Sequence, residues 1–311
     1  MTSEITILRY APTYKKQWDT LVDRARNPNF FFRREYMEYH RDRFSDFSLL
    51  AFRNGNLAAV LPGNIVEEKF YSHQGLTFGG LIVSSKVRAA ESGIILKSIF
   101  QHLKESSITH MIYKKMPYIY SIEPCDDDIY HLIQAGANLK SCHLNQVIDY
   151  RHFSISSERR RFIKKSRRRN IVIEESKDFF SFWSLLERNL SQHDARPTHT
   201  LDEIQFLANV FPQHIKLICA YHNAELLCGT VIFVNENVAH TQYIASSPEA
   251  RTMGALDLLL FETCESFSEK AFFSFGTSNE SEGAYLNEGL AFYKESFGAR
   301  GVAHVTYDLE L

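Results

Sequence analysis

The residues from His240 to Phe267 have the types and the order that can hold an anion. His240 opens a stretch typical of a β-strand, a glycine-containing loop runs from Ser246 to Ala255, and an amphipathic helical pattern follows. In such a connection, unpaired backbone N–H groups and the positive end of the helix dipole face the same point. A pyrophosphate group suits that point. An ordinary strand–loop–helix connection has the same pattern, so both interpretations stay open.

A second segment with groups for ligand binding is rich in glycine. His73 and Thr77 lie among Gly75, Gly79 and Gly80. Glycines let a backbone approach a ligand closely, so these two side chains can bind a sugar or a phosphate group. The glycines can equally well permit a turn between two strands.

Two further places carry candidate binding side chains. Tyr120, with Lys114 and Lys115 nearby, can stack on a base and meet a diphosphate, or these residues can form a solvated strand face. His193 and His199 flank an Arg-Pro pair in a loop, where binding residues concentrate. Each of these histidines can instead be an ordinary surface residue.

A basic run stands in the middle of the chain, because eight of the twelve residues from Glu158 to Arg169 are lysine or arginine. It can form a solvated helix, contact phosphates of a donor or acceptor, or bind tRNA. The run marks the predicted division of the chain into residues 1–150 and residues 151–311.

Composition sets the class of protein. The chain has 311 residues, enough for two domains, with 44% hydrophobic and 23% charged residues, which excludes a disordered chain. A net charge of -2 excludes a generic nucleic-acid binder. The five cysteines form no Cys-x-x-Cys pair, and the sequence has neither a signal peptide nor an apolar run of membrane-spanning length. We therefore expect reduced thiols and a cytoplasmic protein without a membrane span.

The elements that must position these residues alternate between helical and strand patterns. Apolar spacing predicts helices over Ser92–Leu103, Asp178–Leu190 and Leu256–Phe267, and a Thr200–Glu203 capping box predicts a helix from Leu201. Residues 49–61 and 218–230 both read as strand, Asn-centred turn, strand, and plausible helices over 34–43 and 201–209 precede them. This pattern indicates an internal duplication, although convergent hairpins would look the same.

The C-terminal half resembles the GNAT (Gcn5-related N-acetyltransferase) superfamily. Its signature is Arg/Gln-x-x-Gly-x-Gly/Ala, which Arg251 and Gly254 match and from which Leu256 departs. A buried strand at Phe272–Thr277 and the segment Asn287–Ala299 follow in the family's order.

A narrower resemblance is to Fem-like acyltransferases found with surface-polysaccharide genes. Residues 71–80, 113–120, 197–203, 275–280 and 286–290 carry it. The resemblance implies an α/β fold with two tandem GNAT-like domains, each a mixed, mostly antiparallel sheet flanked by helices, and a substrate cleft between them. It also implies an amino-sugar nucleotide as the acceptor.

The resemblance implies acyl transfer to an amine, which requires a base for the ammonium proton and hydrogen-bond donors for the developing oxyanion. Glu280, His240, His193 and His199 are the alternatives for the base, and a loop carboxylate or a core histidine is the structural alternative for the first two. Tyr293 stands where many family members place a tyrosine near the sulfur, so it can be the acid or can only pack beneath the cofactor.

The binding residues that the resemblance implies fall into two sets. The acyl-CoA set comprises Ile244, Ala245, Ser246, Arg251, Met253, Gly254, Ala255, Leu256 and Asn287. The acceptor set comprises His73, Thr77, Lys115, Tyr120, His193 and His199.

The function that these observations predict is an N-acyltransferase. It would move an acyl group from acyl-CoA, held by residues 151–311, to the amine of a nucleotide-linked amino sugar, on the side of residues 1–150, by direct attack. We expect no metal and no nucleic-acid partner, and a homodimer fits the superfamily. The rivals are an aminoacyl-tRNA-dependent transferase acting on a cell-wall precursor and a non-catalytic protein that binds acyl-CoA or a sugar nucleotide. The chain has no room for the coiled-coil arm that tRNA-using relatives often carry, which favours coenzyme A.

Overall fold

The computed structural model describes residues 4–192 and 194–311 and divides the chain into two compact units. The first unit comprises Met1–His143 and Ala303–Leu311, and the second comprises Leu144–Val302. The predicted division put residues 303–311 in the second half. They lie in the first unit because the last strand, β17 (Arg300–Glu310), pairs with β8 (His110–Lys114) over Thr306–Glu310.

The first unit contains two groups of strands. An antiparallel sheet has the order β1 (Ile5–Arg9), β3 (Leu49–Arg53), β4 (Asn56–Leu61) and β7 (Ile82–Val83). The second group runs from β17 through β8, β6 (Lys69–Tyr71) and β5 (Asn64–Val66) to β2 (Ser45–Asp46), and only the β6–β8 pair is parallel.

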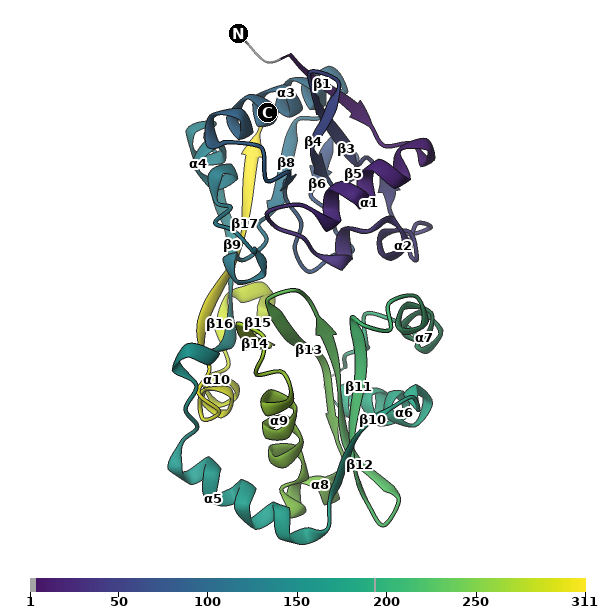
Figure 1. Cartoon of the computed structure of the whole chain (residues 1–311), viewed down its shortest axis with the longest axis vertical. Coiled ribbons are helices and arrows are strands. Elements are labelled where there is room, and N and C mark those ends of the chain that lie inside the picture. Colours follow the sequence, from purple (N-terminus) through teal and green to yellow (C-terminus); the bar gives the residue numbers. More distant parts are fainter. Residues whose placement is uncertain (1–3, 193) are drawn as a thin grey trace. The chain divides into compact units, whose positions relative to one another are not determined.

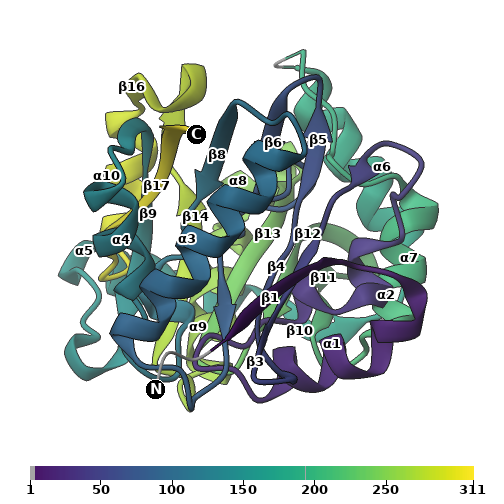
Figure 2. The same cartoon turned by 90° about the horizontal axis from the view of Figure 1, so that it is seen from above.

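Helices cover both faces of the strands of the first unit (Figure 2). α3 (Ala89–Glu105) and α4 (Asp127–Gln134) lie on one face, and α1 (Lys15–Asp23) and α2 (Arg34–Met37) lie on the other. Short 3-10 turns occur at Pro12–Tyr14, Phe30–Phe32 and Tyr118–Tyr120. The apolar spacing of α3 buries Leu96, Ile99 and Leu103 against strand residues such as Leu49 and Met111, which forms the core of this unit.

The second unit has one sheet with helices on both faces (Figure 1). The strand order is β10 (Val172–Ser176), β11 (Ile215–His222), β12 (Glu225–Val234), β13 (Val238–Ser246), β14 (Phe272–Thr277) and β9 (Asn138–Asp149), and only β13–β14 is parallel. α6 (Phe179–Ser191) and α7 (Leu201–Val210) lie on one face, and α9 (Ala255–Ser266) lies on the other.

The remaining elements of the second unit surround this sheet. They are α5 (Ser157–Ser166), α8 (Pro248–Met253), α10 (Glu288–Glu295), the short strands β15 (Asn279–Glu280) and β16 (Tyr285–Leu286), and 3-10 turns at Tyr150–His152, Arg167–Arg169 and Ser281–Gly283. Among the described helices, none is long and apolar enough to cross a bilayer.

The two hairpins that the sequence singles out share local details. Asn54 and Gly55 have φ values of 47° and 78°, and Asn223 and Ala224 have values of 49° and 65°, so both turns are left-handed. Each hairpin also has a register irregularity at the same place, after Ala51 in the first and after Ala220 in the second. Shared turns and irregularities support the internal duplication more strongly than the residue pattern does.

Candidate active site

Two neighbouring strands of the second unit, β13 and β14, diverge after a short parallel pairing. β13 and β14 pair only between Val238–His240 and Phe272–Ser274. Beyond His240, β13 continues to Ser246 against β12 alone, and its register with β12 shifts so that Gln242 is an extra residue. Such a bulge takes backbone groups out of the ladder, so the diverging strand offers hydrogen-bond groups to a ligand.

His240 stands at the point of divergence, where its ring contacts a buried hydroxyl and lies near a buried lysine. His240 Nδ1 lies 3.1 Å from Ser274 Oγ. Lys294 of α10 is 5% exposed, and its Nζ donates to the carbonyl oxygens of Gly276 (3.1 Å) and Thr277 (2.5 Å) at the end of β14. Gly276 adopts φ 72°, which turns the chain so that both carbonyls face this lysine.

Burial lowers the pKa values of both of these basic side chains. Burial lowers the pKa of Lys294 to about 8. Burial and, secondarily, the nearby Lys294 lower the pKa of His240 to about 4. Among the described residues, no carboxylate lies within ion-pair distance of Lys294 Nζ. At neutral pH the histidine is therefore uncharged, and an appreciable fraction of the lysine is a free amine.

Glu280 lies on the exposed end of β15 and supports a helix cap. Its Oε1 accepts a hydrogen bond from Asn287 Nδ2 at 2.7 Å. Asn287 is the N-cap of α10, and its Oδ1 accepts from the Leu290 N–H at 2.9 Å. The structure thus pairs Glu280 with Asn287 in a loop–helix contact, the structural alternative to a base, and does not bring it to His240.

Tyr293 is engaged in a separate network. Its hydroxyl donates to Asp257 Oδ1 at 2.7 Å, and Arg159 of α5 reaches Asp257 Oδ2 at 2.5 Å while its guanidinium lies 4.6 Å from the Tyr293 ring centre. Burial, followed by the Asp257 carboxylate, raises the pKa of Tyr293. The tyrosine proton therefore points to Asp257, which makes it a poor acid in this arrangement.

The loop that carries the Arg251–Gly254 signature forms the short helix α8, and its glycine packs against α5. Arg251 is exposed, but Gly254 ends α8 with φ 65°, and a Cβ on it would lie 2.3 Å from Ser166 Oγ of α5. Arg169, just after α5, donates from Nη1 to the Thr252 carbonyl at 2.5 Å. The left-handed turn and the packing against α5 thus require a glycine here, and the contact with Ser166 leaves no room for a ligand on that side of the loop.

The other predicted acyl-CoA residues mostly serve the core. Ala245 and Ala255 are buried, and the side chains of Ile244, Met253 and Leu256 are partly buried against apolar clusters. The Ser246 N–H donates to Asn189 Oδ1 of α6 at 2.8 Å, so it is not available as an oxyanion donor in this arrangement.

In the first unit, His73 is buried and Thr77 is exposed. The His73 ring lies 5.4 Å from the ring of His40, and its Nδ1 accepts from the Gly75 N–H at 3.2 Å. Burial and, secondarily, His40 lower the pKa of His73 to about 3. An uncharged, buried histidine adds no positive charge for a phosphate, one of its two predicted contacts, and its contact with a sugar stays a prediction.

Lys115 and Tyr120, which the sequence predicts to contact an acceptor, are buried residues of the first unit. Lys115 Nζ donates to Asp128 Oδ1 (2.6 Å) and to the Cys125 carbonyl (2.5 Å). The Tyr120 ring is 2% exposed and packs 4.6 Å from the ring of Phe78. A side chain that satisfies a buried carboxylate, or that fills a core, is not free to bind a ligand.

His199 lines a pocket of about 570 Å³ beside α6 and α7, although the residue is largely buried. Its Nδ1 lies 2.6 Å from the Tyr243 hydroxyl, and the same hydroxyl accepts from its backbone N–H at 3.2 Å. This contact ties the loop to β13, on which the divergence lies. His193 is outside the described residues.

Lys294 is the functional candidate that sequence reasoning missed. The segment that resembles the family's closing motif includes it, beside Tyr293, but a lysine in an amphipathic helix reads as a solvent-facing residue. The one available signal was its position three residues after Ala291, on the face that α10 buries.

Comparison with known proteins gives a family match over part of the chain. Residues 152–295 match the family described as acetyltransferase (GNAT) domain. A search of curated protein sequences finds no match. Among solved structures, one described as FemX superposes with a TM-score of 0.70 at 11% identity, over 98% of this chain and 97% of that one.

Two other solved structures have the same fold. A tandem GNAT protein from the clavulanic acid biosynthesis pathway has a TM-score of 0.54 at 12% identity, over 99% of this chain and 98% of that one. L-PGS from Bacillus licheniformis has a TM-score of 0.57 at 12% identity, over 80% of each chain. These findings confirm the predicted α/β fold with two GNAT-like domains, and the family match supports an acyltransferase of the GNAT type.

Proposed function

We propose that the protein is an N-acyltransferase that moves an acyl group from acyl-CoA to the amine of a nucleotide-linked amino sugar. The observation that carries the acyl transfer is the buried, carboxylate-free Lys294 beside His240, where β13 and β14 diverge in the domain that matches the acetyltransferase family. The acceptor class rests on the resemblance of residues 71–80 and 275–280 to Fem-like acyltransferases.

Lys294 is the general base in this proposal. A neutral amine has two N–H donors and one lone pair, and Lys294 Nζ has two acceptors, the carbonyls of Gly276 and Thr277. With both donors used, the lone pair can accept the proton of the acceptor ammonium, directly or through one water. A pKa of about 8 is in the range that suits a base near neutral pH.

The deprotonated amine then attacks the acyl carbonyl carbon, and negative charge develops on the carbonyl oxygen. Backbone N–H groups of β13 beyond the Gln242 bulge, where β14 has diverged, supply the hydrogen bonds to that oxygen. His240 is uncharged, so it adds no positive charge that would lower the pKa of Lys294 further. The thiolate leaves without help from a general acid, because a thiol is acidic enough to do so, and the remaining extra proton of the attacking nitrogen passes to that thiolate or to water, which gives the amide and the free thiol.

The donor must fit a loop that differs from the family signature. The packing of Gly254 against Ser166 leaves no room for a diphosphate on that side of the loop, and the acyl transfer does not require one there. Exposed Arg251, at the end of α8, is the remaining predicted group that can meet the phosphates of acyl-CoA.

A thiol-release assay tests the proposal. Acetyl-, 3-hydroxybutanoyl- and longer acyl-CoA are crossed with a panel of nucleotide-linked amino sugars, and release that depends on the acceptor is the expected result. Donor binding confirmed by calorimetry without turnover for any amine would contradict the enzyme and favour a binding protein.

Matched variants identify the base. Lys294→Met should lower kcat/KM by about 10²- to 10⁴-fold, the usual contribution of a general base. Glu280→Gln should change it by less than about tenfold, and Lys177→Met, an exposed lysine of the same unit, should leave it unchanged. A large loss with Glu280→Gln and a small one with Lys294→Met would reverse the assignment.

A second candidate, an aminoacyl-tRNA donor, is favoured by one specific observation on α5. Three basic residues of its run are bound to the unit: Arg159 to Asp257, Arg167 to Glu262 and Arg169 to Thr252. The other five are exposed and have no ion-pair partner among the described residues: Arg160, Arg161, Lys164, Lys165 and Arg168. At 3.6 residues per turn the four that belong to α5 share one face of the helix, and Arg168 follows in the next 3-10 turn, an arrangement that suits a polyanion.

Binding of unfractionated tRNA distinguishes the two donors. The tRNA donor predicts binding that weakens steeply with salt and that the K164E/K165E double variant abolishes, whereas Lys177→Glu leaves it intact. Transfer from acyl-CoA that is unaffected by K164E/K165E would instead establish the coenzyme A donor.

A further inference from the structure

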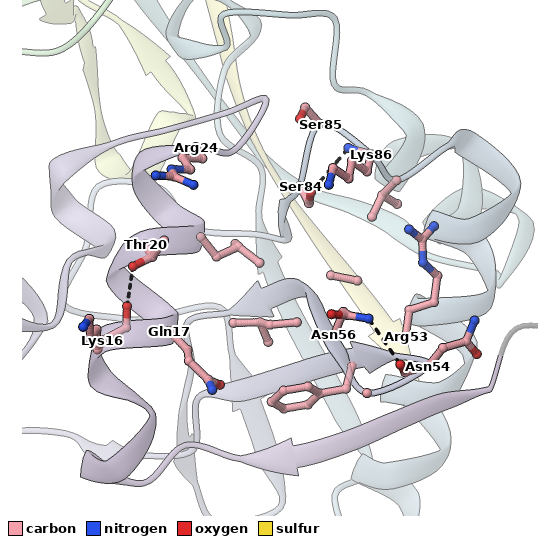
Figure 3. Close-up of a pocket in the computed structure, with 16 residues that line it drawn as sticks. Lys16, Gln17, Thr20, Arg24, Arg53, Asn54, Asn56, Ser84, Ser85 and Lys86 are labelled. Atoms are coloured by element: carbon pink, nitrogen blue, oxygen red, sulfur yellow. Dashed lines mark hydrogen bonds between the residues drawn. The ribbon is translucent and has the colours of Figure 1, made fainter.

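A groove in the first unit has the chemistry of an anion site that the proposed acyl transfer does not use. It encloses about 780 Å³ and is bounded by α1, by the turn of the β3–β4 hairpin and by residues 84–87, which lead into α3. Figure 3 shows α1 along one side of the hollow, with the Asn54–Asn56 turn and Ser84–Lys86 along the other. We propose that this groove binds a ligand that carries a diphosphate.

The lining has one sign of charge. It contains four cationic residues, Lys16, Arg24, Arg53 and Lys86, and no aspartate or glutamate. Arg53 is engaged, because its Nη1 lies 2.5 Å from Glu91 Oε1. The other three side chains are exposed and have no ion-pair partner among the described residues.

The acids nearest in sequence on the same elements are already paired. Asp19 of α1 binds Lys15 at 2.8 Å, and Asp23 binds Arg33 at 3.2 Å. Glu91 is likewise paired with Arg53. These carboxylates therefore do not neutralise the positive charges of Lys16, Arg24 and Lys86. A concave surface with uncompensated charge of one sign concentrates counter-ions, so it attracts an anion more strongly than scattered surface lysines do.

Neutral groups complete the site. The side chains of Gln17, Asn54 and Asn56 bring amide donors from α1 and from the hairpin turn. That turn is left-handed at Gly55, where a Cβ would meet nothing within 4 Å, so the backbone there faces open space. The floor is apolar: Leu21, Ala58 and Val87 are buried beneath the lining, and the Phe52 ring is half-buried.

This combination selects the class of ligand. Cations on α1 and on the segment before α3 stand on opposite sides of the hollow, which suits an anion with more than one charge better than a single carboxylate. An apolar floor with a half-buried ring suits a flat organic group attached to that anion. A nucleoside diphosphate has both parts, and inorganic pyrophosphate has only the first.

Calorimetry on the full chain tests the proposal with uridine diphosphate, inorganic pyrophosphate and uridine as probes. Uridine diphosphate should bind, and the R24E/K86E variant should weaken its affinity by at least about tenfold, the loss expected when charge-assisted contacts are removed. The matched control is Lys97→Glu, the same reversal on an exposed lysine of α3 outside the groove, which should have no effect. Binding should also weaken between low and high salt.

The probes separate the sources of affinity. Pyrophosphate that binds as tightly as uridine diphosphate supports the anion site and assigns the ligand to free polyphosphate rather than to a nucleotide. Uridine diphosphate binding that R24E/K86E leaves intact, that Lys97→Glu weakens equally, or that does not occur overturns the proposal. Because the groove contains none of the residues assigned to acyl transfer, thiol release in R24E/K86E distinguishes this failure from a failure of the proposed enzyme.

Discussion

Two buried lysines, Lys294 and Lys115, show that burial alone does not decide whether a side chain is charged. Burial on its own lowers the pKa of Lys294. Lys115 is as deeply buried, and burial alone would lower its pKa too, but the Asp128 carboxylate outweighs that effect and raises the pKa. The first environment produces a base, and the second produces a permanent cation that holds a core together.

The lowered pKa of Lys294 predicts the pH dependence of the reaction. A base acts in its neutral form, so kcat/KM should rise with pH, reach half of its maximum near pH 8 and level off above it. Lys294→Arg, which stays charged throughout this range, should not show the rise. A rate that falls above pH 8 would mean that the charged form of Lys294 is the active one, and would overturn its role as a base.

The Lys115–Asp128 pair predicts a large loss of stability when it is broken. Lys115→Met leaves the Asp128 carboxylate buried without its cation, which should cost about 3–5 kcal/mol of unfolding free energy. Because the folded pKa of Lys115 is raised, its stabilising effect is present below pH 10.5 and is lost as pH rises through the folded value. Denaturant unfolding, followed by the fluorescence of Trp18 in the same unit, measures both effects.

The measurement for Lys115 has a matched comparison. The double variant K115M/D128L removes both charges and should be less destabilised than Lys115→Met alone. An unchanged stability of Lys115→Met would show that the pair contributes nothing. Trp183, in the second unit, should report no change in any of these variants.

At the scale of elements, the contact between α5 and the α8–α9 junction explains why residue 254 is glycine. An alanine there meets Ser166 Oγ at 2.3 Å and must adopt φ 65°, so Gly254→Ala should destabilise the second unit by about 2–4 kcal/mol. Removing the obstacle with Ser166→Gly should recover the packing part of that loss, but not the backbone part.

Thermal unfolding of Gly254→Ala, of Ser166→Gly and of the double variant, followed by Trp183 fluorescence, measures this coupling. If Gly254 instead serves a bound diphosphate, Gly254→Ala should weaken ligand binding with little change in stability, and Ser166→Gly should restore nothing. The same contact therefore distinguishes a packing glycine from a ligand-binding one.

The elements that the sequence predicts well are those specified by local pattern. The Thr200–Glu203 capping box is present with both of its hydrogen bonds, and the predicted helices correspond to α3, α6 and α9 within a few residues. The helix expected over 34–43 is short, because α2 ends at Met37. Apolar periodicity fixes the face of a helix but not where its last turn ends.

The candidate site was harder to predict, because its parts come from distant segments. Lys294 is brought to the His240 region by its hydrogen bond to the Gly276 carbonyl, in the turn at the end of β14. Lys115 binds Asp128 across an irregular loop, which has no periodic sequence pattern. Local patterns could not say which carboxylates or carbonyls would face these two lysines. Glu280 was a candidate because it follows β14, and its bond to Asn287 depends on the local geometry of α10.

At the scale of the whole molecule, the first unit depends on the end of the chain. Five residues of β17 pair with β8, and Leu309 is 2% exposed in the core of the first unit. Deletion of residues 303–311 should therefore destabilise the first unit by several kcal/mol, because an apolar core residue and a ladder are lost together. The second unit contains none of these residues.

The chain has one tryptophan in each unit, which allows the two to be followed separately. In the deletion variant, Trp18 fluorescence should report unfolding at lower denaturant, whereas Trp183 should report an unchanged midpoint. Single-tryptophan versions made with Trp18→Phe and Trp183→Phe assign the signals. Equal shifts at both tryptophans would show that the two units unfold as one.

The position of β17 also has a consequence during synthesis. A ribosome makes the N-terminal unit first, yet that unit lacks a strand until residues 303–311 have been added, after the whole of the second unit. At ordinary elongation rates this delay lasts on the order of ten seconds. Throughout that interval β8 has an unpaired edge, so the nascent chain is most exposed to aggregation, and most in need of a chaperone, while its second half is still being translated.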